Sequence, residues 1–270
     1  MNSESAAERV DTGKPHPARR YDYWLGGKDN FPADRESADA VAEAFPTIRM
    51  AAVENRNFLR RVTRYLTAEA GIRQFLDIGS GLPTAGNVHE IAQDIAPESR
   101  IVYVDNDPIV LVHSRDLLNS SPEGATAYMD ADLRDPQRIL THPDLLATLD
   151  MTQPVALMLV AVLHFFPDDQ QPFDLVRQLV EGLPSGSYLV MSHATNDYMD
   201  EMDVARTDEA NERSGVPFQL RSTAEFARFF TGCTMVAPGI TSVTAWRPEE
   251  YRPHPRAEAV AMLGAVARVP

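Results

Sequence analysis

Two glycines at the end of a short apolar segment carry the strongest chemical signal in this chain of 270 residues. Residues 74–78 predict a buried strand, Gly79-Ser80-Gly81 follows it, and the next residues have a helical pattern. Such a turn exposes backbone N–H groups to a ligand, because residues without a Cβ tolerate close approach and positive φ. A second strand pattern, 101–105, ends in Asp105, where carboxylates bind ribose hydroxyls. The chain is therefore expected to bind a nucleoside-containing cofactor.

The residues around the glycines indicate which cofactor this is. A dinucleotide-binding fingerprint would place a third glycine at position 84, but that residue is Thr84, preceded by Pro83. Asp77, just before the glycines, favours a positively charged ligand. This arrangement resembles motif I of class I S-adenosylmethionine methyltransferases, whose cofactor has a sulfonium, an ammonium and a ribose but no phosphate. Two alternatives remain at this point: a nicotinamide oxidoreductase, or an ordinary turn with Asp105 capping a helix.

Polar residues also follow the later predicted strands. Because ligands of open α/β sheets lie outside the carboxyl ends of the strands, these residues are expected to face one crevice. Asp132 follows the strand at 125–129, and a carboxylate there can accept a hydrogen bond from the adenine amino group. Acids are also common at helix N-termini, so any one of these could be only a cap. The predicted cofactor-binding residues are Asp77, Gly79, Ser80, Gly81, Asp105, Asn106, Asp132, Leu133 and Val162.

Two histidines at strand ends are the candidate catalytic residues. His164 follows the strand at 155–162 and His193 ends the strand at 187–193. Either could act as a general base near neutral pH, or could be a buried histidine bonded to a neighbouring loop. No carboxylate or cysteine lies at metal-ligand spacing from them, so no metal site is expected.

The order of predicted elements indicates an α/β fold. Helical patterns alternate with the five strands and fall near 86–95, 108–119, 143–149, 170–182, 197–213 and 222–230. Continuously apolar central strands are typical of a parallel sheet covered on both faces. Two last strands, 235–237 and 241–246, are joined by Pro238-Gly239 and predict a hairpin. The expected fold is a seven-stranded, mostly parallel, Rossmann-like sheet with an antiparallel terminal strand.

An aromatic block lies N-terminal to this sheet. Residues 20–31 are too rich in Gly, Asp and Asn to predict a regular element, and two helices follow at 34–45 and 49–70. The block could fold over the crevice as a lid or could only fasten the N-terminus to the domain. Asn55 interrupts the apolar stripe of the second helix and needs a polar partner. The candidate lid or substrate residues are Tyr21, Tyr23, Trp24, Asn30 and Asn55.

Composition narrows the functional classes. The net charge is 25 − 39 = −14, which disfavours binding to nucleic-acid phosphates. No apolar run reaches the roughly 20 residues needed to span a bilayer, so no membrane partner is expected. The N-terminus lacks the apolar core of a signal peptide, and the single cysteine, Cys233, suits a reducing cytoplasm.

Several blocks resemble an actinobacterial family of S-adenosylmethionine-dependent methyltransferases within the class I superfamily, formerly a domain of unknown function. The similarity covers nearly the whole chain. It is carried by residues 20–31, 54–56, 75–84, 87–90 and 103–108, and Pro83 stands where the wider class has a loop glycine. The resemblance implies the fold and the cofactor, S-adenosylmethionine, but no substrate.

The organisation that follows has three parts: a mobile tail at 1–18, an N-terminal helical lid at 19–70 and a cofactor-binding domain at 71–270. The expected activity is methylation of an oxygen or nitrogen of a small molecule. A protein that binds S-adenosylmethionine as a sensor or regulator, without turnover, is the second hypothesis. The oligomeric state is left open.

Overall fold

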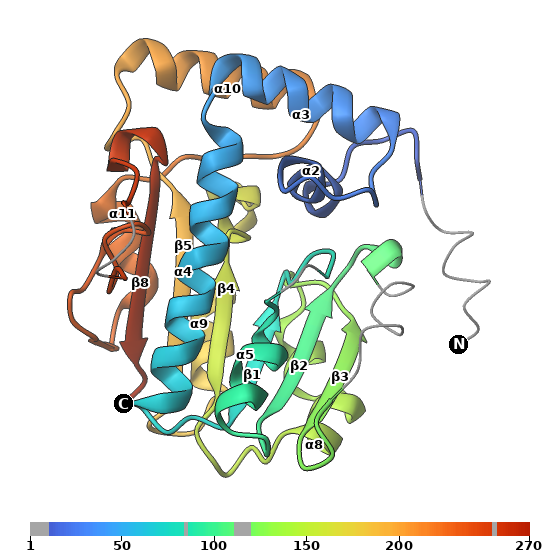
Figure 1. Cartoon of the computed structure of the whole chain (residues 1–270), viewed down its shortest axis with the longest axis vertical. Helices are drawn as coiled ribbons and strands as arrows, with labels where there is room; N and C mark the ends of the chain where they lie inside the picture. Colours follow the sequence, from blue (N-terminus) through green and yellow to red (C-terminus); the bar gives the residue numbers. More distant parts are fainter. Residues whose placement is uncertain (1–10, 84–85, 111–119, 250–252) are drawn as a thin grey trace.

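The protein is described by a computed structural model over residues 11–83, 86–110, 120–249 and 253–270. Figure 1 shows a sheet flanked by helices, with a group of helices across one end of its strands. None of the described helices is long and apolar enough to cross a membrane.

The described strands form one mixed sheet of eight members. Its order is β3-β2-β1-β4-β5-β8-β6, and β7 pairs with β8. The first five strands in this order are parallel, whereas β8 is antiparallel to β5. The bounds are β1 (Gln74–Ile78), β2 (Arg100–Asp105), β3 (Ala125–Asp130), β4 (Ala156–Val160), β5 (Tyr188–Ala194), β6 (Thr234–Met235), β7 (Thr241–Ser242) and β8 (Met262–Arg268). The predicted α/β class and the mostly parallel sheet are confirmed.

Helices cover both faces of the sheet. One face packs on α4 (Ile48–Ala68) and α5 (Val88–Ile95), and the other packs on α7 (Pro136–Leu140), α8 (Pro143–Thr148), α9 (Pro172–Glu181) and α11 (Thr223–Ala227). Successive strand residues alternate between these faces. Leu76 and Ile78 belong to the α9 side, whereas Phe75 belongs to the α4 side. Asp77 therefore points toward α4.

Three helices form a cap over the carboxyl ends of the strands. They are α2 (Pro17–Trp24), α3 (Pro32–Ala44) and α10 (Glu201–Ser214). Figure 1 shows α2 above the upper ends of β1 and β2, with α3 and α10 across the top of the molecule. The buried Arg20 ties them together, because its Nη1 lies 3.3 Å from Ser37 Oγ and 3.2 Å from Ser214 Oγ. Short 3-10 turns complete the chain: η1 (Leu163–Phe165), η2 (Asp168–Gln170), η3 (Arg228–Phe230) and η4 (Ala257–Ala259).

The predicted C-terminal hairpin is wrong. Strands β6 and β7 do not pair with each other; both lie along the same edge of β8, with Met235 opposite Ala267 and Thr241 opposite Gly264. The residues between them, Pro238 among them, leave the sheet, because proline has no N–H to donate to a ladder. The antiparallel strand that completes the sheet is β8, which the sequence patterns did not predict.

The N-terminal block is more regular than expected. Residues 17–24 form α2, with Pro17 at its first position and His16 at its N-cap. The helix ends at Leu25, and Gly26 follows with φ +83°. Gly27 is required by packing, because a Cβ there would lie 1.9 Å from Asp22 Oδ1.

Two other expectations concern the N-terminal tail and the helix predicted at 108–119. The tail was expected to extend to residue 18; residues 1–10 lie outside the described residues, but residues 11–18 contact the rest of the protein. The guanidinium of Arg19, for example, donates to the carbonyls of Asp11 and Lys14. The predicted helix at 108–119 falls mostly on residues 111–119, which also lie outside the described residues.

Candidate active site

A cavity of about 280 Å³ lies between the cap and the carboxyl ends of β1, β2, β3 and β4. Most of the predicted site residues line it, although they come from separate strand ends and from the N-terminal block. They are Asp77, Gly79, Ser80, Gly81, Asp105, Asn106, Asp132, Leu133, Val162, Tyr21 and Asn55. The parallel register explains this convergence: Ile78 pairs with Val104, and Asp105 pairs with Asp130.

The two loop glycines serve different purposes. Both have positive φ, +74° at Gly79 and +66° at Gly81. A Cβ on Gly79 would lie 2.5 Å from Val162 Cγ2, so this glycine lets the ends of β1 and β4 pack together. Among the described residues, a Cβ on Gly81 would meet only the Cβ of Ala18, at 3.9 Å. Gly81 is thus the position at which the loop stays open toward the cavity.

Asp105 lies between the glycine loop and the loop after β2. Its Oδ2 accepts a hydrogen bond from Gly81 N at 2.8 Å, and its Oδ1 accepts one from Asp107 N at 3.0 Å. Burial raises the pKa of Asp105, and these two N–H groups oppose that shift. Each carboxylate oxygen has two lone pairs, so both keep one for a ligand hydroxyl.

Asp77 and Arg56 bring opposite charges to the same part of the cavity. Burial raises the pKa of Asp77 to about 7, the positive charge of Arg56 opposes this shift, and Asp105 adds to it. The Arg56 guanidinium also donates to Gly86 O at 3.2 Å and to Asn87 Oδ1 at 3.3 Å. A carboxylate beside a guanidinium matches the ammonium and carboxylate of an amino acid.

Asp132, two residues after β3, belongs to a cluster of polar residues in the cavity wall. It accepts hydrogen bonds from Asn106 Nδ2 at 3.0 Å and from Arg134 N at 2.8 Å. Partial burial opposes ionisation, but the backbone and side chain of Arg134 and the amide of Asn106 together lower the pKa of Asp132. The guanidinium of Arg134 lies 4.8 Å from the ring centre of Phe166, which also lines the cavity.

Tyr21 brings α2 into the cavity wall. Its hydroxyl donates to Ala52 O and accepts from Asn55 Nδ2, both at 2.9 Å. Burial raises the pKa of Tyr21. The phenol is therefore a fixed, neutral polar group, and Asn55 has the polar partner that its place in an apolar stripe requires.

Three other predicted lid residues do not line the cavity. Trp24 is buried and donates its indole N–H to Ala38 O at 3.2 Å. Tyr23 contacts Asp39 at 3.1 Å, and Asn30 donates to Asp22 Oδ2 at 2.8 Å. These residues hold α2 and its following turn in place. The N-terminal block thus combines both alternatives, with one face of α2 toward the cavity and another fastened to α3.

The two predicted catalytic histidines, His164 and His193, lie outside the cavity lining. His193 is fully buried; its Nδ1 lies 2.7 Å from Ala194 O and its Nε2 lies 2.8 Å from Arg221 Nη1. Burial lowers the pKa of His193 to about 3, and it lowers the pKa of His164 well below the usual value. Histidines that are buried, neutral and bonded to the protein support the core.

Sequence patterns missed several cavity residues. His16 and Pro17 had a usable signal, because proline at the first helical position marks a helix start. Arg56 follows Asn55 in a block that carried the family resemblance, but only the fold brings its charge near Asp77. The cavity-lining residues outside the predicted set are Pro15, His16, Pro17, Ala18, Asp22, Leu25, Arg56, Leu59, Ile78, Leu82, Val104, Ala131, Arg134, Val160, Ala161, Phe165, Phe166 and Gly215-Val216-Pro217.

Comparison with known proteins identifies the family. The model of the S-adenosyl methyltransferase family matches residues 3–270. The chain belongs to this family. None of the curated proteins matches the chain in sequence.

Two solved structures support the membership. A DUF574 family protein from Streptomyces avermitilis is 49% identical, with a TM-score of 0.92 over 97% of this chain and 100% of that one. A candidate methyltransferase from Thermobifida fusca is 40% identical, with a TM-score of 0.88 over 96% of both chains. The resemblance read from the sequence is thus confirmed, and the chain is an S-adenosylmethionine-dependent methyltransferase.

A more distant structure shows the wider fold. The magnesium protoporphyrin IX methyltransferase of Synechocystis, solved with bound SAH (S-adenosylhomocysteine), is 14% identical, with a TM-score of 0.54 over 93% of both chains. The fold of this methyltransferase is therefore that of the class I enzymes, and its cofactor is S-adenosylmethionine. The nicotinamide alternative is excluded.

Proposed function

We propose that this methyltransferase transfers the methyl group to an oxygen or nitrogen of a small molecule bound beneath the cap. The observation that carries this proposal is the cavity, in which the strand-end carboxylates share one partly open space with apolar and aromatic side chains. At about 280 Å³ it is close to the lower end of small-molecule sites, which are roughly 300–1,000 Å³. The roof made by α2 leaves a space suited to a small ligand.

The residues present fit the cofactor from end to end. Asp77 and Arg56 offer opposite charges to its amino-acid end, which carries an ammonium and a carboxylate. Asp105 keeps free lone pairs for ribose hydroxyls next to Gly81. Asp132 and Leu133 lie where the adenine edge would lie, with Asn106 orienting the carboxylate. This assignment makes the three strand ends one continuous cofactor seat.

The acceptor would occupy the part of the cavity that remains. That part is lined by Tyr21, Leu25 and Leu59 from the N-terminal helices, by Val162 and Phe165 after β4, and by Val216 after α10. When bound, the cofactor supplies a methyl group that is already activated on a sulfonium. Placing the acceptor in line with that group supplies most of the rate, since proximity alone is worth about 7–11 kcal/mol in well-oriented reactions. Tyr21, fixed by Asn55, is suited to orient the acceptor.

Net charge and cysteine content suggest the class of substrate and the cellular compartment. A net charge of −14 opposes a nucleic-acid substrate. One cysteine cannot form an intrachain disulfide, which suits the cytoplasm. We infer a cytoplasmic enzyme with a small-molecule substrate.

Incubation with S-adenosylmethionine labelled in its methyl group tests the proposal. The purified protein would be mixed with a small-molecule extract of an actinobacterium, and the products separated by chromatography and mass spectrometry. We expect one labelled small product, which disappears with Asp105→Ala. Tight S-adenosylmethionine binding without any transferred label would instead favour the sensor hypothesis. Label found only in protein or nucleic acid would contradict a small-molecule acceptor.

A further inference from the structure

The segment just before α2 forms part of the cavity wall at the proposed ribose position. Pro15, His16, Pro17 and Ala18 all line the cavity. Ala18 is the residue that a Cβ on Gly81 would meet, so the segment crosses directly over the open glycine of the loop. Residues 15–18 therefore face the residues that we assign to cofactor binding.

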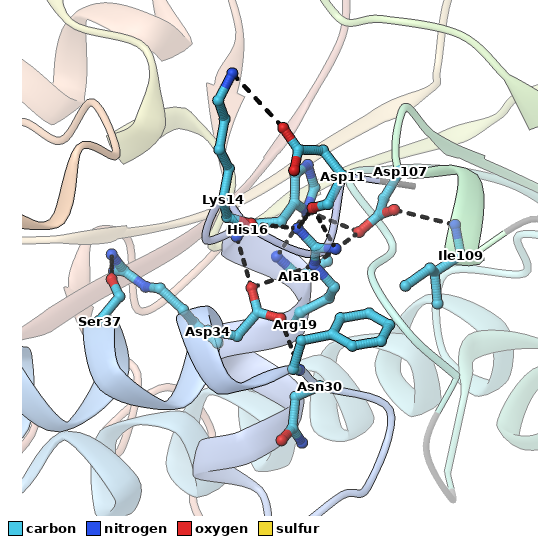
Figure 2. Close-up of polar contacts among 12 residues, drawn as sticks. Asp11, Lys14, His16, Ala18, Arg19, Asn30, Asp34, Ser37, Asp107 and Ile109 are labelled. Atoms are coloured by element: carbon cyan, nitrogen blue, oxygen red, sulfur yellow. Dashed lines mark hydrogen bonds and ion pairs between the residues drawn. The ribbon is translucent and has the colours of Figure 1, made fainter. Parts of the chain in front are cut away.

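Buried charges hold this segment in place. His16 N donates to Asp34 Oδ1 at 2.8 Å, and Arg19 Nε lies 3.2 Å from the same oxygen. Arg19 Nε also lies 3.7 Å from Asp107 Oδ2, and the side chains of Arg19, Asp34 and Asp107 are almost fully buried. Figure 2 shows Arg19 between the two carboxylates. These contacts link the segment to α3 and to the loop after β2, which also carries Asp105.

The imidazole of His16 has one nitrogen engaged and one left over. Its Nδ1 lies 3.0 Å from Asp107 Oδ2 and 3.3 Å from Ala18 N. One nitrogen cannot both donate to the carboxylate and accept from the backbone. The shorter bond to a charged acceptor is the stronger, so we assign the proton to Nδ1. In the neutral ring this leaves the Nε2 lone pair as a hydrogen-bond acceptor.

His16 is also close to Asp105. His16 and Asp105 both line the cavity. Asp107 connects the two side chains. Its backbone N–H donates to Asp105 Oδ1, and its carboxylate oxygen Oδ2 lies 3.0 Å from His16 Nδ1. The His16 side chain is 29% exposed, so it is reachable from the cavity that it lines.

We propose that His16 is a second ligand of the cofactor's ribose, with its Nε2 accepting a hydrogen bond from one hydroxyl while Asp105 accepts from the other. A ribose diol has two O–H donors, and the site offers two acceptors, His16 Nε2 and the Asp105 carboxylate. Asp107 acts as the positioning residue, because it fixes the ring and its tautomer through Nδ1. This inference rests on the proposed cofactor seat and adds the N-terminal segment to it.

Removing a ribose hydroxyl from the ligand isolates the contact. Calorimetry would compare S-adenosylhomocysteine with its 2′-deoxy and 3′-deoxy analogues, on the wild-type protein and on His16→Ala. We expect His16→Ala to weaken S-adenosylhomocysteine about 3- to 10-fold, the range of one neutral hydrogen bond. The same substitution should leave the affinity of one of the two deoxy analogues unchanged, since that analogue has already lost the contact.

Two control variants separate this contact from folding. His16→Asn keeps a good N-cap residue for α2 but is too short to reach the ribose, so it should lose the same affinity with an unchanged melting temperature. Lys14→Ala removes a side chain whose ammonium pairs with Asp11 at the surface, and it should change nothing. Equal loss for all three ligands, or no loss with His16→Asn, would overturn the proposal. Failure of the wild-type protein to bind S-adenosylhomocysteine would instead contradict the cofactor seat itself.

Discussion

The side-chain amide of Asn55 in α4 donates a 2.9 Å hydrogen bond to the hydroxyl of Tyr21 in α2. The carbonyl of the same amide accepts from Ser192 Oγ at 2.6 Å, and that hydroxyl accepts from Ala161 N at 2.9 Å. Ala161 has a left-handed φ of +55° at the end of β4, beside the cavity. One buried amide thus connects the cap to the ends of β4 and β5.

Disrupting this connection should affect both stability and cofactor binding. We expect Asn55→Ala to lower the free energy of unfolding by about 1–3 kcal/mol, because buried hydroxyls of Tyr21 and Ser192 lose a partner. Tyr21→Phe should cost less, about 1 kcal/mol. Urea unfolding of both variants and of the double variant gives their coupling, expected at roughly 0.5–3 kcal/mol. Strictly additive effects would show that the hydrogen bond is not maintained in solution.

The two loop glycines should respond differently to the same substitution. Gly79→Ala combines a positive φ with a Cβ placed 2.5 Å from Val162, so we expect a loss of about 3 kcal/mol or more. Gly81→Ala has the φ penalty alone, about 1–2 kcal/mol, because its Cβ meets no described residue closer than 3.9 Å. Chemical denaturation would measure both. Adding Val162→Ala should recover part of the loss in Gly79→Ala but none of the loss in Gly81→Ala.

Asp77 should make the unliganded protein less stable as the pH rises. Its pKa in the folded state, about 7, lies above the unfolded value of about 3.9. The folded state therefore binds more protons between pH 4 and 7, so the free energy of unfolding falls across this window and stays low above it. Asp77→Asn should be more stable than the wild type by about 1–3 kcal/mol at pH 8, with a smaller difference at pH 5. Thermal unfolding at the two pH values measures this, and an equal difference at both would contradict it.

The same carboxyl should link cofactor binding to proton release. An ammonium bound beside Asp77 favours the ionised form, so binding at pH 6 should expel a proton. Calorimetry in two buffers with different ionisation enthalpies would measure that proton, and affinity should rise with pH up to about 7. In Asp77→Asn the binding enthalpy should no longer depend on the buffer. Unchanged proton release in that variant would assign the proton to another group.

His193 should matter for stability and not for the chemistry. Its pKa of about 3 in the folded state lies below the unfolded value of about 6.5, so the unfolded state takes up a proton first as the pH falls. Its contribution to stability is therefore present above pH 6.5 and is lost on acidification. We expect His193→Gln to cost about 2 kcal/mol or more, because Arg221 loses a buried partner.

The turnover of His193→Gln distinguishes a role of His193 in stability from a role in catalysis. The shape of the pH–rate profile between pH 6 and 9 should not change when rates are scaled to folded protein. His142→Gln, at the N-cap of α8 and outside the cavity lining, is a matched histidine control. Loss of an acidic limb of the profile in His193→Gln alone would restore a role as general base.

Much of the cofactor seat was determined by local sequence. A glycine-bearing loop directly after an apolar strand, and acids at the ends of the next two, need only the parallel register to bring Asp77, Gly81, Asp105 and Asp132 together. Short-range patterns also located the five parallel strands. These features depend on residues that are neighbours in the chain, so the sequence alone predicts them.

Tertiary structure decided the rest, because the deciding contacts join residues far apart in the chain. His164 and His193 end strands as catalytic residues do, but packing against Arg221 and the aromatic core removes them from the cavity. Pro17 marks the helix start that follows His16 in the sequence, but only the fold places His16 beside Asp107. Strand β8 pairs with β5, β6 and β7 only after the sheet has formed. Burial and pairing of this kind depend on which surfaces meet, and a local pattern carries no information about that.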